Sequence, residues 1–217
     1  MLLVNQDWSS YPSGTTISNG GYYGMEYENI TGYASTMKQR YGETNPSIIK
    51  TVYAPSKSCM GLSISASNDW LNVIDLRRKY KDFKFEIQTG ITKDVRSCVA
   101  GRCSYPTTYD NTTVYVFICM PTLNYCGVEY WSPTSSAILA SSVPTGITDN
   151  NNFIQTIQCS GNNIKTFLNG VQQHNIIDTR ITTEGYVGLY SLNGIEVGKY
   201  TVSDLNSEPT KVIARLI

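Results

Sequence analysis

The sequence lacks a net charge: its 217 residues contain 17 lysines and arginines against 17 aspartates and glutamates, and 16% of the residues are charged. Proteins that bind nucleic acid or anionic membranes through electrostatic attraction normally carry an excess of positive charge. No apolar run approaches the length of a membrane-spanning helix. The sequence therefore predicts neither nucleic acid binding nor membrane insertion.

The sequence also has little of what catalysis and metal binding require. No Gly-x-Ser-x-Gly motif, phosphate-binding glycine loop or Cys-x-x-Cys pair is present. The one histidine, His174, lies inside a predicted strand and is interpreted as an ordinary surface or hairpin residue. We expect the six cysteines to be buried free thiols, with local bridges as the alternative (Cys98–Cys103 and Cys119–Cys126). No nucleophilic triad, zinc site or cofactor is predicted.

Strand and turn residues are abundant in the sequence. Tyrosine (16 residues) far outnumbers phenylalanine (5) and tryptophan (3), and serine, threonine and asparagine are common. This mixture suits half-buried strands joined by polar turns. Residues 82–89 alternate between polar and apolar with a period of two, which predicts a strand. The pattern of residues 132–143 fits either a helical turn or a loop. We predict a single all-β domain built as a two-sheet sandwich.

Two Asn-Gly pairs lie between strand-forming runs in the C-terminal third. One pair is Asn169-Gly170, and the other, Asn193-Gly194, precedes the last predicted strand, 195–205. Asn-Gly favours a two-residue type I′ turn, in which both central residues have positive φ angles. The sequence therefore predicts two hairpins within an antiparallel meander.

The runs around these turns resemble the concanavalin A-like lectin/glucanase superfamily, in its laminin G-like and sugar-hydrolase-associated branches. The opening residues 3–12 resemble the first strand of that superfamily, and Asp82-Phe83 resembles the start of a middle strand. The resemblance implies a two-sheet antiparallel jelly-roll sandwich over residues 1–206, with its first strand beside its closing strand. Because the superfamily includes lectins, glycosidases, adhesion modules and virion proteins, the fold alone assigns no chemistry. The resemblance is carried by residues 161–171, 178–182, 185–190 and 197–205.

Catalytic and metal residues of the superfamily have no clear counterpart in the sequence. Laminarinase-type members carry Glu-x-Asp-x-x-Glu on one strand, which places two carboxylates at catalytic separation. The nearest imitation is Glu26-Tyr-Glu28, interpreted as an exposed strand face. Laminin G-like relatives often bind calcium through loop oxygens, and the resemblance makes Asp149 and Asp178 weak candidates for that role. We therefore predict no catalytic residues and no resident metal.

A sugar-binding site needs an aromatic platform beside polar groups that pair with hydroxyls. The run 125–131 matches this need best, although its aromatic residues have the alternative of packing in the sandwich or covering its rim. Two arginines on the preceding strand are candidate hydrogen-bond donors, and a tryptophan near residue 70 is a second exposed candidate. The predicted carbohydrate-binding residues are Trp131, Tyr130, Glu129, Tyr125, Arg102, Arg96 and Trp70.

The predicted function also depends on the residues at the two ends of the chain. Residues 207–217 end in an apolar run, which we expect to dock on the sandwich or on another subunit. Residues 1–8 lack the basic and apolar segments of a secretory signal. These features favour a non-enzymatic structural or adhesive virion protein, such as a phage capsid-decorating, fibre or tail-associated module, made in the host cytoplasm. Its predicted partners are other virion proteins, further copies of itself and cell-surface glycans. The alternatives are an extracellular carbohydrate-binding module and, with least support, a glycosidase-like enzyme.

Overall fold

The structure is a computed structural model of the chain. It describes residues 79–91, 97–104, 113–150, 152–191 and 195–206, together with the strand segments 2–6, 16–17, 23–25, 35–39, 48–54, 59–65 and 70–73.

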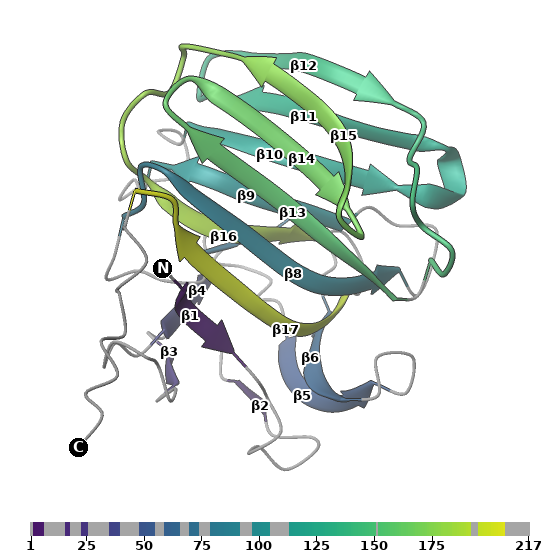
Figure 1. Cartoon of the computed structure of the whole chain (residues 1–217). Coiled ribbons are helices and arrows are strands. Elements are labelled where there is room, and N and C mark those ends of the chain that lie inside the picture. Colours follow the sequence, from purple (N-terminus) through teal and green to yellow (C-terminus); the bar gives the residue numbers. More distant parts are fainter. Residues whose placement is uncertain are drawn as a thin grey trace, which may run out of the picture.

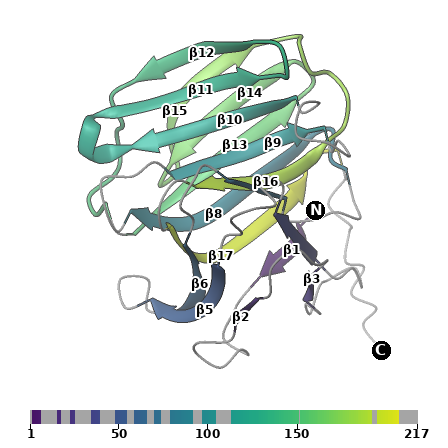
Figure 2. The same cartoon turned by 180° about the vertical axis from the view of Figure 1, so that it is seen from behind.

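The described strands form two antiparallel sheets, which face each other as the two layers of a sandwich (Figures 1 and 2). Sheet I has nine strands and sheet II has eight. In spatial order sheet I contains β15 (Val171–Ile177), β14 (Asn163–Leu168), β13 (Phe153–Ser160), β8 (Phe83–Ile91), β17 (Ile195–Asp204), β6 (Cys59–Ser65), β5 (Ile48–Ala54) and β2 (Thr16–Ile17), and β1 (Leu2–Gln6) pairs with β17. Sheet II contains β12 (Ser136–Ser142), β11 (Tyr125–Trp131), β10 (Val114–Met120), β9 (Ser97–Cys103), β16 (Tyr186–Ser191), β7 (Trp70–Val73), β4 (Ser35–Gln39) and β3 (Tyr23–Met25).

This arrangement confirms the predicted all-β, two-sheet antiparallel sandwich. β1 also lies beside the closing strand β17, with Gln6 opposite Tyr200, as the resemblance implied. Residues 132–143, expected to be a helical turn or a loop, instead contain the edge strand β12. β12 pairs with β11 and is the edge strand of its sheet. Small and apolar residues occur on both of its faces, so its period-two signal is weak. The apolar run 207–217 lies outside the described residues.

The two Asn-Gly pairs have different outcomes. Asn169 and Gly170 have φ angles of 48° and 81°, and they join β14 to its antiparallel partner β15, which confirms the first hairpin. The second hairpin prediction was wrong, because the strands on either side of Asn193-Gly194 belong to different sheets. β16 pairs with β7 and β9 in sheet II, whereas β17 pairs with β8, β6 and β1 in sheet I. The preference for a turn is local, whereas burial against the rest of the sandwich selects the pairing partners.

The main core lies between the two sheets. Phe83, Phe85 and Ile87 of β8 extend inward from sheet I at every second residue, and they pack in one cluster with Tyr115 and Phe117 of β10. All five side chains are buried. Because successive residues of a strand point to opposite faces, the alternate residues of β8 and β10 define the outer faces of the sandwich.

Sheet II also carries an apolar cluster on its outer face. Cys98 and Ala100 of β9 and Val116 and Ile118 of β10 alternate with residues of the main core, and they form a separate buried cluster. Tyr125 and Trp131 of β11 pack against it. Among the described residues, none belongs to a helix with the length and hydropathy needed to span a bilayer.

Candidate functional site

Three of the predicted sugar-binding residues form a row on the outer face of β11. Tyr125, Glu129 and Trp131 are separated by even numbers of residues, so they point to the same side of sheet II. Cys126 and Val128, between them in sequence, belong to the core on the other side. All three side chains of the row are half-buried. The period-two pattern thus brings together an acid and two aromatic rings, which we call the β11 row.

Hydrogen bonds fix the geometry of the β11 row. Trp131 Nε1 donates to Glu129 Oε2 at 2.7 Å, and Tyr125 Oη donates to Glu129 Oε1 at 3.4 Å. The ring of Tyr125 lies over Gly127, because a Cβ atom at position 127 would be 2.4 Å from the Tyr125 hydroxyl oxygen. Burial, together with the neighbouring Glu129 carboxylate, raises the pKa of the Tyr125 phenol, so it stays a proton donor at neutral pH. The carboxylate is therefore oriented between a phenol and an indole.

The residues across the strands from Glu129 are apolar. Val116 of β10 lies opposite Glu129 on one side, and Ile138 of β12 lies opposite it on the other. Val116 is fully buried, whereas Ile138 is 66% exposed and extends the apolar surface of the row. Within the strands that the structure describes in sheet II, Glu129 is the only acidic residue. The β11 row therefore presents one carboxylate in an apolar and aromatic frame.

Tyr130 does not belong to this face. It points to the opposite side of β11 from its two neighbours in sequence and packs against the main core. Its ring lies 6.2 Å from that of Tyr115, and the Arg180 guanidinium lies over it at 5.4 Å from the centroid. For Tyr130, the alternative to sugar binding, which was packing inside the sandwich, is therefore correct. Trp131 lies on the outer face.

The two weak calcium candidates are placed apart from any cluster of metal ligands. Asp178 Oδ1 accepts hydrogen bonds from Tyr115 Oη at 2.6 Å and from the Arg180 backbone N–H at 2.9 Å. The second oxygen of Asp178 pairs with the Arg180 guanidinium. Asp149 is exposed. No group of three or more His, Cys, Asp or Glu side chains suited to a metal ion occurs in the described ranges.

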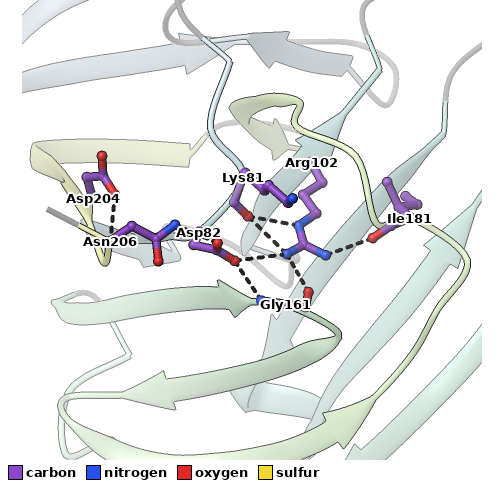
Figure 3. Close-up of polar contacts among 7 residues, drawn as sticks. All are labelled: Lys81, Asp82, Arg102, Gly161, Ile181, Asp204 and Asn206. Atoms are coloured by element: carbon purple, nitrogen blue, oxygen red, sulfur yellow. Dashed lines mark hydrogen bonds and ion pairs between the residues drawn. The ribbon is translucent and has the colours of Figure 1, made fainter.

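Arg102 is buried, and its guanidinium contacts three other segments of the chain, at residues 81–82, 161 and 181 (Figure 3). Nη1 donates to the Ile181 carbonyl at 2.7 Å, and Nη2 donates to the carbonyls of Lys81 at 2.9 Å and Gly161 at 2.5 Å. Nε donates to Lys81 as well, and Nη2 lies 3.6 Å from Asp82 Oδ1. Because Arg102 is 1% exposed and these donors are committed to the fold, we exclude it from the candidate sugar site.

Local backbone geometry explains why Arg102 leaves the face of its strand. Its φ angle is 50°, in the left-handed region, and the pairing of β9 with β16 shifts register between Tyr186 and Gly188. Such a bulge redirects the side chain of the extra residue. Gly185 makes the close approach possible, because a Cβ atom there would lie 2.4 Å from the Arg102 carbonyl carbon.

Asp82 completes this inner cluster with Arg102. Burial alone would raise the pKa of the Asp82 carboxyl, but hydrogen bonds from Asn206 and the Gly161 backbone N–H, with the charge of Arg102, lower it overall. The Asn206 amide donates to Oδ2 and the Gly161 N–H donates to Oδ1, each at 2.6 Å. The aspartate of the Asp82-Phe83 motif is thus a structural anchor at the start of β8.

The remaining predicted residues contribute nothing to the β11 row within the described structure. Trp70 lies in β7 of sheet II, opposite Ser191 of β16, and three strands separate β7 from β11. Arg96, Glu26 and Glu28 lie outside the described residues.

His174 lies in the hairpin of β14 and β15, as one of its two predicted interpretations stated, but it is not a surface residue. Its side chain is buried between the edge strands of the two sheets and links them. Nδ1 is 2.8 Å from Thr166 Oγ1 in sheet I, and Nε2 is 3.1 Å from Ser142 Oγ in sheet II. The Ser142 hydroxyl in turn lies 3.1 Å from Cys126 Sγ, and the imidazole meets the ring of Phe117 edge-on at 6.0 Å. Burial lowers the pKa of the imidazole.

Comparison with solved structures identifies the architecture. A family 16 glycoside hydrolase endo-glucanase from Bacteroides ovatus matches with a TM-score of 0.59 at 8% identity, over 77% of this chain and 94% of that one. A protein of unknown function with a galectin-like fold from Bacillus subtilis matches with a TM-score of 0.58 at 8% identity, over 89% and 98%. The carbohydrate-binding module CBM66 from B. subtilis matches with a TM-score of 0.52 at 15% identity, over 64% and 85%.

The chain has a concanavalin A-like jelly-roll fold. No model of a known protein family matches the sequence, and no curated protein sequence matches it. The concanavalin A-like fold is thus shared with a carbohydrate-binding module and a glycoside hydrolase, so the fold by itself assigns no function to this chain.

Proposed function

We propose that this protein is a non-enzymatic, lectin-like module that binds glycans on the outer face of sheet II. The observation that carries the proposal is the β11 row, in which the Glu129 carboxylate is held between Tyr125 and Trp131. Sugars present apolar C–H faces that stack on aromatic rings and hydroxyls that donate to carboxylates. The row offers both kinds of contact on a rigid strand, with the exposed Ile138 beside it.

Binding without cleavage is favoured by the number of acids on this sheet. Hydrolysis of a glycosidic bond with retention ordinarily needs two carboxyl groups about 5 Å apart, one as acid and one as nucleophile. The described strands of sheet II supply Glu129 alone. We therefore assign Glu129 to ligand binding rather than to acid or nucleophile chemistry.

The predicted role in a virion, and the predicted virion or extracellular location, remain predictions from the sequence. A glycan-binding face is compatible with either setting, because both a virion adhesin and a free carbohydrate-binding module contact glycans. Glycan binding at the β11 row is therefore proposed for a virion protein and for an extracellular module alike.

A glycan screen with two matched variants tests this proposal. Trp131→Ala removes the aromatic platform of the β11 row, whereas Phe167→Ala removes a half-buried ring from the outer face of sheet I. We expect wild type and Phe167→Ala to bind the same oligosaccharides, and Trp131→Ala to lose affinity by at least about tenfold because stacking is lost. Equal binding by all three proteins would contradict the proposed site, and release of reducing sugar by the wild type would contradict the proposed lack of catalysis.

A further inference from the structure

Three properties of Glu129 bear on the kind of ligand that it would bind. It is half-buried, both of its hydrogen-bond donors are neutral, and no described lysine or arginine forms an ion pair with it. Along its strand it lies between Tyr125 and Trp131, and across the sheet it lies between Val116 and Ile138. A carboxylate held by neutral donors and without a counter-ion can pair its negative charge with a bound cation.

The described cations near sheet II are directed elsewhere. The Arg102 guanidinium is enclosed by backbone carbonyls, and that of Arg180 is paired with Asp178 beside Tyr130, on the opposite side of β11. Lys79 lies 5.8 Å over the ring of Tyr186, whose strand is separated from β11 by β9 and β10. Among the described residues, Glu129 is therefore the one charged group at the β11 row, and its charge is negative.

We propose that the ligand of the β11 row is an amino sugar with a free ammonium group, of the glucosamine type. This inference rests on the proposed glycan-binding function and specifies its ligand class. The ammonium group pairs with the Glu129 carboxylate, while the faces of Tyr125 and Trp131 attract the same cation through their π systems and stack on the sugar ring. Uronic acids and sulfated sugars are repelled by the same carboxylate.

Four tetrasaccharides measured by calorimetry test the ligand class directly. The glucosamine tetramer has an ammonium group at C2 where cellotetraose has a hydroxyl. In the N-acetylglucosamine tetramer this nitrogen is acetylated and uncharged. Tetragalacturonate carries negative carboxylates instead of positive ammonium groups. We expect the glucosamine tetramer to bind about fivefold more tightly than cellotetraose, with tetragalacturonate weakest. This preference should shrink at about 0.5 M salt, where charges are screened within a few ångströms, while cellotetraose binding stays constant.

Glu129→Gln and a matched control, Glu184→Gln, identify the residue responsible. Glu184 is an exposed acid in the loop before β16, so its substitution makes the same change in net charge away from the row. We expect Glu129→Gln to bind glucosamine and cellotetraose tetramers equally, and Glu184→Gln to keep the wild-type preference. Thermal unfolding of each variant separates loss of the carboxylate from loss of the fold.

The outcomes distinguish the ligand class from the function. If wild type binds neutral glycans through Trp131 with no preference for the ammonium sugar, the inference fails and the proposed function stands. An undiminished preference in Glu129→Gln, or tighter binding of tetragalacturonate, would also overturn the inference. If no oligosaccharide in the set or in the glycan screen binds, both proposals fail.

Discussion

The outer faces of the two sheets differ in how their charges are satisfied. On sheet I, Lys84 and Glu86 of β8 form an ion pair at 2.9 Å, and Gln88 of the same strand donates to Asn152. On sheet II, apolar residues of β9 and β10 are buried on the outer face, and the carboxylate of Glu129 has only neutral donors.

This difference distinguishes the outer face of sheet I from the proposed binding surface on sheet II. On the outer face of sheet I, the Lys84–Glu86 ion pair lies beside polar side chains, and exposed apolar side chains occur there too, at Ile154 and Ile177. The outer face of sheet II differs in the two aromatic rings of the β11 row beside the Glu129 carboxylate, whose hydrogen-bond donors are neutral. Aromatic rings beside a few polar groups are typical of ligand-binding sites. This contrast, rather than the fold, supports the proposed binding site on sheet II.

Replacing Arg102 should have the largest effect, and it should affect both faces together. Arg102→Met removes the guanidinium that joins Lys81, Gly161 and Ile181, and leaves Asp82 without its buried partner. We expect the free energy of unfolding, measured in urea, to fall by about 3 kcal/mol. Loss of sugar binding with unchanged stability would instead place Arg102 in the site and break the distinction between scaffold and binding face.

Gly127→Ala should disturb the binding face alone. The added methyl group displaces the Tyr125 ring, whose hydroxyl oxygen lies 2.4 Å from the new Cβ position, and so breaks the contact between Tyr125 and Glu129. We expect affinity for the preferred oligosaccharide to fall by about tenfold with little change in melting temperature. Gln158→Ala, a half-buried position on the outer face of sheet I, is the control and should leave affinity unchanged. An equal loss of affinity in both variants would contradict the contrast between the faces.

Acid should loosen the edge where β12, the strand beside the β11 row, meets sheet I. His174 joins Thr166 to Ser142 of β12, and burial lowers its pKa below the value in the unfolded chain. The unfolded state therefore binds the proton more readily, so stability present above about pH 6.5 is lost as the pH falls toward the lowered pKa. Urea unfolding between about pH 7.5 and 5.5 should show this loss in wild type and a flatter profile in His174→Gln. A profile that is the same in both proteins would rule out this role.

The smallest effect is expected on the outer face of sheet I. Lys84→Gln breaks the ion pair with Glu86, in which both side chains are about one-third exposed. Because solvent screens such a pair, the free energy of unfolding should change by less than about 1 kcal/mol, and sugar affinity should not change. A clear loss of sugar affinity in Lys84→Gln would place ligand contacts on sheet I and contradict the proposed site on sheet II.

The sequence predicted the features that depend on neighbours along the chain. The sequence prediction singled out the run 125–131, although it grouped Tyr130 with the others and Tyr130 packs against the core. The even spacing of Tyr125, Glu129 and Trp131 places those three on one face of the strand. The turn at Asn169-Gly170 followed from the φ preferences of two adjacent residues.

Features that depend on distant residues were missed. The inward turn of Arg102 depends on a bulge against β16 and on carbonyls 21 to 79 residues away, which no local pattern reveals. His174 lies among polar residues in sequence, and its burial results from the approach of β12 across the sandwich. In the same way, β17 pairs with β8 of sheet I rather than with β16, the strand that precedes the Asn193-Gly194 pair.

The most direct test of the account follows the indole N–H of Trp131 by NMR during titration with the oligosaccharide that binds best. The chain has three tryptophans, so the indole signals are few and can be assigned by substitution. We expect the Trp131 indole signal and the backbone amides of β11 and β12 to shift together with one dissociation constant. Shifts confined to β8, β13 and β14 of sheet I, with the Trp131 signal unchanged, would contradict the assignment of the binding face to sheet II.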